Sequence, residues 1–196
     1  MIICRRNFLA ASLVLPFMCG GRAIAGGELF PINMKEGTDL EYKFQRRDMA
    51  YDSAEPAGTL VVDPHRCFLY HVLGGGQATR YGVSVGKSAM AWAGEVTINK
   101  MTAWPIWIPA PYHIQHKPAL AKYLPGGMPG GPDNPMGARA LYLFKGEVDT
   151  VNRIHGAAKV VDIGQKHTAG CIGMLNVDVA HLYSQVQIGT RVVMLA

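Results

Sequence analysis

The sequence has few cysteines, no run of basic residues and little charge overall. Of its 196 residues, 17% are charged and 49% are hydrophobic, and only 4 are cysteine. The lysines and arginines do not cluster, which argues against a nucleic-acid partner. Beyond the first 25 residues no stretch is long and apolar enough for a transmembrane helix. The chain can bury one substantial core and is too short to predict several domains.

The first residues have the pattern of an export signal. "MIICRRNFLAASLVLPFMCGGRAIAGG" contains two arginines, an apolar stretch and then the small-x-small pattern that signal peptidase accepts. We expect residues 1–25 to be removed and the mature protein to reach the periplasm or cell envelope of a bacterium. "CRRNFLA" resembles a twin-arginine signal, although the basic region of an ordinary signal has the same appearance. The mature chain would keep 16 basic and 14 acidic residues.

Two cysteines remain after the leader, Cys67 and Cys171. In an oxidising compartment a pair of thiols is compatible with one structural disulfide. Cys67, however, lies in the apolar run "RCFLYHVL", where a lone cysteine is typically a small buried hydrophobe. We therefore favour two separate thiols over a Cys67–Cys171 bridge.

The rest of the chain divides into an N-terminal extension and one strand-rich domain. Residues 26–57 are polar with scattered aromatics and without a sustained period, so we expect them to lie along the domain surface. Residues 58–196 contain short runs rich in β-branched and aromatic residues, separated by Gly, Pro and Asp. These runs are "TLVVD", "RCFLYHVL", "ATRYGVSVG", "EVTIN", "ALYLF", "NRIHG" and "TRVVML".

Two helices are predicted, together with one long irregular segment. A helix over 177–186 would follow Asn176 as its N-cap, and a weaker pattern covers 118–124. The segment 104–140 is too rich in proline and glycine for a continuous strand or helix, yet it carries tryptophans and tyrosines that can be buried. Long loops of this content are commonly functional, so we interpret it as a lid or groove wall.

A histidine and a cysteine near the C-terminus form a candidate catalytic pair. His155 ends an apolar run and Cys171 follows Gly170 in "HTAGCIGMLN". A thiol attacks a carbonyl when a base can take its proton and when donors wait for the oxyanion. The glycine would let backbone N–H groups approach a substrate oxygen closely. On its own, one such pair is a weak signal.

The surrounding residues resemble a known family. "IHGAAKVVDIGQKHTAGCIGMLN" followed by "VDVAHLYSQVQIGTRVVML" is similar to the catalytic domain of the L,D-transpeptidases, the YkuD or ErfK/YbiS/YcfS/YnhG family of bacterial cell-wall enzymes. The family pattern of His-Gly, a spacer, Ser/Thr-x-Gly-Cys and a later Asn falls on His155-Gly156, 168–171 and Asn176. The resemblance covers roughly residues 58–196.

The resemblance implies a fold and a reaction. The expected fold is mostly β, with two packed mixed sheets, one or two short helices and a long Pro/Gly-rich loop. The expected substrates are peptidoglycan stem peptides, in which the enzyme cleaves an L,D amide, releases the D-residue and passes the thioester-bound acyl group to an amine. No metal or other cofactor is implied.

The resemblance also assigns roles to residues. Cys171 would be the nucleophile, His155 the base, and the Gly156 carbonyl the group that orients the imidazole. The backbone N–H groups of Gly170 and Cys171 are candidates for the oxyanion hole. The remaining candidates for substrate contacts are Thr168, Ala169, Asn176 and Arg139.

Two positions depart from the family pattern. Family members usually carry His, Arg or Ser where Ala169 stands, and usually arginine where Gly173 stands. Loss of that guanidinium removes a partner for a substrate carboxylate, a contact worth about 1.5–3 kcal/mol. Two alternatives therefore stay open: an L,D-carboxypeptidase or amide hydrolase of the same fold, and a non-catalytic wall-binding domain.

Overall fold

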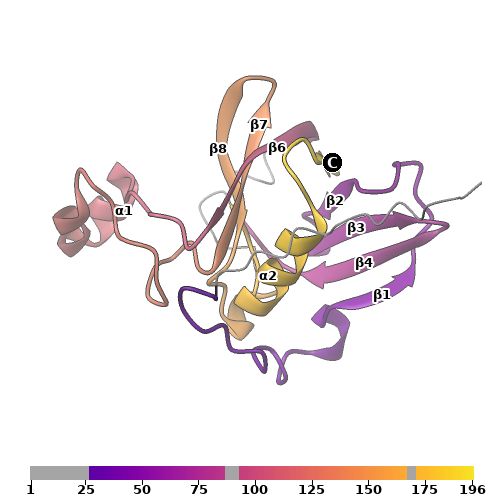
Figure 1. The fold of residues 1–196 in the computed structure, drawn as a ribbon, viewed down its shortest axis with the longest axis horizontal. Coiled ribbons are helices and arrows are strands. Elements are labelled where there is room, and N and C mark those ends of the chain that lie inside the picture. The colour runs from indigo at the N-terminus through magenta and orange to yellow at the C-terminus, as the bar shows by residue number, and fades with distance from the viewer. Residues whose placement is uncertain (1–26, 87–92, 167–170) are drawn as a thin grey trace, which may run out of the picture.

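The computed structural model describes residues 27–86, 93–166 and 171–196, and in these residues most regular structure is β. The strands are β1 Arg47–Ala50, β2 Leu60–Asp63, β3 Phe68–Gly74, β4 Gln77–Gly82, β5 Ser84–Val85, β6 Gly94–Ala103, β7 Arg139–Lys145, β8 Val148–His155, β9 Ile172–Gly173 and β10 Arg191–Met194. The helices are α1 Pro111–His116 and α2 Asn176–Gln185, with short 3-10 turns η1 Tyr42–Phe44, η3 Pro118–Tyr123 and η4 Val160–Asp162. The prediction of a mostly β fold with few helices is confirmed (Figure 1). Among the described helices none is long and apolar enough to cross a membrane.

The strands join in one mixed ladder rather than in two separate sheets. Its order is β1-β4-β3-β2-β10-β6-β7-β8-β9-β5, with parallel pairs β2/β10 and β8/β9. The C-terminal strand β10 bridges the two halves, because it pairs with β2 on one side and with β6 on the other. Only Val83 separates β4 from β5, yet these strands lie toward opposite ends of the ladder. The sheet must therefore curl until its ends approach each other.

The curled sheet encloses one main core together with α2. Leu60 and Leu69 come from one half of the ladder, Leu141 and Ile154 from the other, and all four are fully buried beside Leu182 of α2. Each such side chain contributes about 1.5–3 kcal/mol when it is removed from water. The packing of both halves onto one core gives the arrangement that the sequence predicted as two packed layers, with a continuous hydrogen-bonded connection between them.

The N-terminal extension contributes an edge strand that the sequence did not predict. Strand β1 pairs antiparallel with β4, and Tyr51, which follows it, stacks on Tyr70 with ring centroids 4.3 Å apart. The four-residue run "RDMA" is too short and too polar to show a strand period. Its pairing is set by the sheet edge and the aromatic contact rather than by its own pattern.

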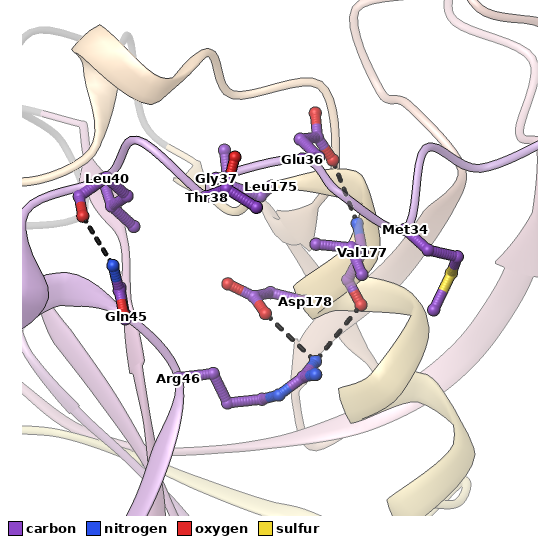
Figure 2. A pocket seen from close by; sticks show the side chains of 10 residues that line it. All are labelled: Met34, Glu36, Gly37, Thr38, Leu40, Gln45, Arg46, Leu175, Val177 and Asp178. Atoms are coloured by element: carbon purple, nitrogen blue, oxygen red, sulfur yellow. Dashed lines mark hydrogen bonds and ion pairs between the residues drawn. The ribbon is translucent and has the colours of Figure 1, made fainter.

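The extension also braces the start of α2 (Figure 2). Glu36 accepts a hydrogen bond from the Val177 amide at 3.1 Å, and Arg46 donates to Asp178 at 3.1 Å and to the Val177 carbonyl at 3.4 Å. Glu36 thus takes the place of an N-cap, and the expectation that the Asn176 side chain caps this helix is wrong. A cavity of about 350 Å³ lies between the extension and the helix. Its lining residues are Met34, Glu36, Gly37, Thr38, Leu40, Gln45, Arg46, Leu175, Val177 and Asp178.

Asp178 makes the stability of the fold depend on pH. Burial raises the pKa of this carboxyl to about 6, in spite of the Arg46 charge beside it. Between about pH 4 and pH 6 the folded chain holds a proton that the unfolded chain releases, so stability falls as the pH rises through this window. We expect Asp178→Asn to raise the free energy of unfolding by about 1–3 kcal/mol more at pH 8 than at pH 4, because the buried carboxyl is charged only at the higher pH. The asparagine amide oxygen can still accept a hydrogen bond from Arg46.

Urea unfolding of the unsubstituted protein and of Asp178→Asn at pH 4 and pH 8 measures this difference. Asp52→Asn, at an exposed aspartate of the extension, is the matched control and should give no such difference. Equal effects of Asp178→Asn at pH 4 and pH 8 would show that the carboxyl titrates normally.

Candidate active site

The parallel pair β8/β9 places His155 and Cys171 on the same face of the sheet. Ile154 pairs with Ile172, both fully buried, and His155 pairs with Gly173. Because side chains alternate along a strand, His155 and Cys171 lie on the face opposite the two isoleucines. The Cys171 thiol forms a hydrogen bond with the Arg153 backbone, and the Cys171 carbonyl accepts from the Gly86 amide at 3.0 Å. His155 and Cys171, which are sixteen positions apart in the sequence, are thus diagonal neighbours on adjacent strands.

The His155 ring is oriented by the carbonyl of the next residue. Its Nδ1 lies 2.7 Å from the Gly156 oxygen. A carbonyl oxygen can only accept, so Nδ1 carries the proton and Nε2 keeps its lone pair. Burial lowers the His155 pKa to about 4, the Arg153 charge lowers it further, and the bond to Gly156 opposes both. The imidazole is therefore neutral at neutral pH and can accept a proton at Nε2.

The Cys171 thiol is also neutral at rest. Burial raises its pKa, while the Arg153 backbone and charge act in the opposite direction. A neutral thiol beside a neutral imidazole differs from a thiolate–imidazolium pair, because proton transfer must accompany attack.

Cys67 lies apart from this site in a buried position. It is 2% exposed, and its sulfur contacts the carbonyl oxygens of Pro64 at 3.8 Å and Gln165 at 3.9 Å. The structure does not join Cys67 to Cys171, in agreement with the preference for two separate thiols. The prediction of Cys67 as a small buried hydrophobe is confirmed.

Asn176 forms hydrogen bonds with the backbone that follows His155 and with the backbone that precedes β7. Its Oδ1 accepts hydrogen bonds from the Ala138 amide at 2.8 Å and from the Ala157 amide at 3.1 Å. Ala157 has a φ of +63°, a left-handed conformation that an L-residue adopts at a cost of about 1–2 kcal/mol. A Cβ atom at Gly156 would overlap with Asn176 Oδ1, so the glycine allows the close approach. The expected contact of Asn176 with substrate stays a prediction, while its two hydrogen bonds indicate that it positions the backbone.

Removal of the Asn176 acceptor should destabilise the fold. Asn176→Ala leaves two backbone N–H groups without their partner, and we expect a loss of about 2–5 kcal/mol in the free energy of unfolding. Asn176→Asp keeps an oxygen acceptor at the same place and should lose clearly less. Chemical denaturation of both variants at neutral pH makes the comparison, and equal losses would show that the two bonds are unimportant.

Arg139 is held by the extension and by α2. Its guanidinium donates to the Glu28 carboxylate at 2.8 and 2.6 Å, and its Cζ lies 5.3 Å from the Tyr183 ring centroid. The next residue, Ala140, pairs with His155, so the Arg139 side chain points to the opposite face of the sheet. The structure does not bring the guanidinium together with the His155 and Cys171 side chains, and its contact with substrate stays a prediction.

Three further predicted residues, Thr168, Ala169 and Gly170, lie outside the described residues. Within residues 27–86, 93–166 and 171–196, no group of three or more His, Cys, Asp or Glu side chains is arranged to hold a metal ion.

Residues 57–194 match the model of the L,D-transpeptidase catalytic domain, YkuD. The chain belongs to this family. A probable L,D-transpeptidase of Escherichia coli, ErfK/SrfK, is 34% identical over 96 residues, which are 49% of this chain and 29% of that protein. The Salmonella typhimurium ErfK/SrfK is 31% identical over 137 residues, or 70% of this chain and 38% of that protein. The chain therefore matches less than two fifths of the length of either relative.

Solved structures show the same fold. A Brucella melitensis protein described as a probable carnitine operon oxidoreductase is 42% identical, with a TM-score of 0.54, and the match covers 79% of this chain and 95% of that one. That description concerns the Brucella protein. An L,D-transpeptidase from Mycobacterium smegmatis is 18% identical, with a TM-score of 0.50, and the match covers 70% of this chain and 58% of that one.

The family departure at Gly173 has a local explanation in packing. Gly173 pairs with Ser84 of β5, and a Cβ atom at position 173 would overlap with Ser84 Oγ. An arginine therefore cannot replace this glycine unless Ser84 moves. The register of β8 and β9 instead places Arg153 beside Cys171, and its charge acts on the thiol. The sequence analysis did not identify Arg153. Its position two residues before His155 on a strand was the available signal, because i and i+2 share a face.

The Pro/Gly-rich segment is folded on itself and projects from the β body (Figure 1). It contains α1 and η3, and Trp107 pairs with Met128 in an isolated bridge. A cavity of about 410 Å³ lies within it, lined by Trp107, Lys117, Ala119, Leu120, Lys122, Tyr123, Met128, Asp133 and Pro135. The weaker helical pattern at 118–124 corresponds to the 3-10 turn η3. The role of this segment as a lid stays a prediction.

Proposed function

We propose that this protein is an exported L,D-transpeptidase that acts on peptidoglycan stem peptides in the bacterial envelope. One observation carries the proposal: in a chain of this family, His155 and Cys171 share a face of adjacent strands, and the Gly156 carbonyl fixes the imidazole. Residues 1–25, which would direct export, lie outside the described residues.

In the first half-reaction, the Cys171 sulfur attacks the carbonyl of the L,D amide while its proton passes to His155 Nε2. A C–S bond forms, and the negative charge gathers on the carbonyl oxygen, where the backbone N–H groups of Gly170 and Cys171 are the proposed donors. When the tetrahedral intermediate collapses, the C–N bond breaks and the imidazolium returns its proton to the departing amine. The products are the free D-residue and a thioester on Cys171.

In the second half-reaction, an amine of a neighbouring stem attacks the thioester. His155 Nε2 takes a proton from the attacking nitrogen, the C–S bond breaks and the proton returns to the sulfur. The neutral imidazole of the resting site suits both steps, since it must accept a proton each time. An L,D-carboxypeptidase would share the first half-reaction and use water in the second.

The test is incubation of the mature protein with a disaccharide-tetrapeptide, with and without an added amine, followed by intact-mass and product analysis. A thioester on Cys171 and an amine-exchanged or dimeric product are expected. Tripeptide alone would assign the protein to the hydrolases, and a folded protein that forms no thioester would be a non-catalytic wall-binding domain.

A further inference from the structure

A row of basic and aromatic side chains runs across the sheet toward Cys171. Lys100 of β6 pairs with Tyr142 of β7, and Tyr142 pairs with Arg153 of β8. Directly paired residues point to the same side, so these three residues share the face of His155. The register of β8 and β9 places Cys171 next in line. We call Lys100, Tyr142 and Arg153 the basic row.

Contacts within the basic row hold its members in place. The Lys100 ammonium lies 4.8 Å from the Tyr142 ring centroid, and the Arg153 guanidinium carbon lies 4.4 Å from it. Asp149 accepts two hydrogen bonds from Arg153 at 2.7 and 2.8 Å. The Arg153 side chain is only 13% exposed, whereas Lys100 is exposed. One carboxylate faces two cations here, so the group keeps a net positive charge.

We propose that the basic row binds a carboxylate of the peptide substrate on the acyl-donor side of Cys171. This inference rests on the proposed function, because it concerns recognition of the same peptide. Arg153 Nη1 donates to Asp149 and to the Asn152 carbonyl, and Nη2 donates to Asp149, which together with the Tyr142 ring fix the guanidinium. A substrate carboxylate would meet the edge formed by Nε and the second N–H of Nη2, a fixed pair of parallel donors. Lys100 adds a second charge at the open end of the row.

The dimensions of the row fit a short peptide. Neighbouring strands are about 4.8 Å apart, so three steps separate Lys100 from Cys171 by about 14 Å. The acyl donor has three residues on this side of the scissile amide, and three extended residues span about 10–11 Å. A peptide whose scissile carbonyl lies at the thiol can therefore extend past Arg153 to Tyr142, about 10 Å away, where the Lys100 ammonium lies 4.8 Å from the ring centroid. Stem peptides carry free carboxylates along this length.

The basic row also supplies a positive charge in place of the arginine that the family usually carries at position 173. The strand that carries the nucleophile cannot hold an arginine at that position because Ser84 occupies the space. Arg153 supplies a cation from the adjacent strand, and its charge acts on the Cys171 thiol and on the His155 ring alike.

Binding to a protein without the nucleophile tests this inference apart from turnover. In the Cys171→Ala background, the dissociation constant is measured for a tetrapeptide with free carboxylates and for the same peptide with these groups amidated. We expect Arg153→Gln to weaken binding of the charged peptide about 10- to 50-fold and Lys100→Gln about 3- to 10-fold. Binding of the amidated peptide should change less than about twofold in both. Lys145→Gln, at an exposed lysine at the end of β7 outside the row, is the matched control.

The outcomes separate the two proposals. Equal weakening for both peptides, no weakening, or no binding of either peptide would overturn the role of the row. Charge-dependent binding through Arg153 in a protein whose Cys171 form yields no thioester would instead refute the proposed catalysis and leave the row as a peptide-binding site. Unfolding curves of each variant establish that it is folded before binding is compared.

Discussion

Replacement of Cys171 by alanine is expected to abolish thioester formation and to lower L,D-transpeptidase turnover by at least about 10³-fold. The sulfur is the only protein group in the proposed mechanism that forms a bond to the substrate carbonyl, and loss of a nucleophile removes the covalent route altogether. Incubation with a disaccharide-tetrapeptide and, separately, with a carbapenem should each add mass to the native protein. Neither should add mass to the alanine variant.

Cys67 provides the matched control for this experiment. It is the second thiol of the described chain, it is 2% exposed, and burial raises its pKa. Cys67→Ala should leave both adducts and turnover within about twofold, although some stability is lost because a buried sulfur is removed. An adduct that persists in Cys171→Ala and disappears in Cys67→Ala would refute the assignment of the nucleophile.

Much of the fold could be predicted because buried strands have recognisable runs of apolar residues in the sequence. β2, β3, β7 and β10 coincide with runs of branched and aromatic residues that alternate or are fully buried. β1 and β9 could not be predicted, because two to four residues carry no period. The continuity of the ladder was equally hidden, since it depends on the pairing of the last strand with β2, far away in sequence.

The proposed catalytic pair left a clearer pattern in the sequence than the contacts of the residues around it. His155 and Cys171 were identified from a motif, and the structure gives them a common face. The contact of Asn176 with substrate stays a prediction, whereas the hydrogen bonds of its Oδ1 to the backbone of two other segments were not foreseen. The contact of Arg139 with substrate also stays a prediction, whereas its ion pair with Glu28 of the extension was not foreseen. Such contacts between distant segments leave no pattern in a single sequence.

The chemistry of Cys171 should show a steep dependence on pH. We expect its alkylation by iodoacetamide to accelerate about tenfold for each pH unit between pH 6 and pH 8, or about 100-fold in total. Burial raises the thiol pKa, so the reactive thiolate is a small fraction that grows with pH. The His155 pKa of about 4 leaves the ring neutral, and a neutral ring cannot hold a thiolate by charge. Acylation of Cys171 by the tetrapeptide, the first half-reaction, should lose its general base only below about pH 4, where His155 becomes protonated.

Substitution of His155 separates these two effects. His155→Gln should leave the pH dependence of alkylation nearly unchanged, because the resting thiol owes no charge stabilisation to the ring. The same substitution should lower transpeptidation about 10²- to 10⁴-fold, the usual contribution of a general base. A pH-independent alkylation rate between pH 6 and pH 8 that becomes steep in His155→Gln would reveal a thiolate–imidazolium pair. In that case the environment of Cys171 stabilises charge, and the neutral resting state derived from its burial is wrong.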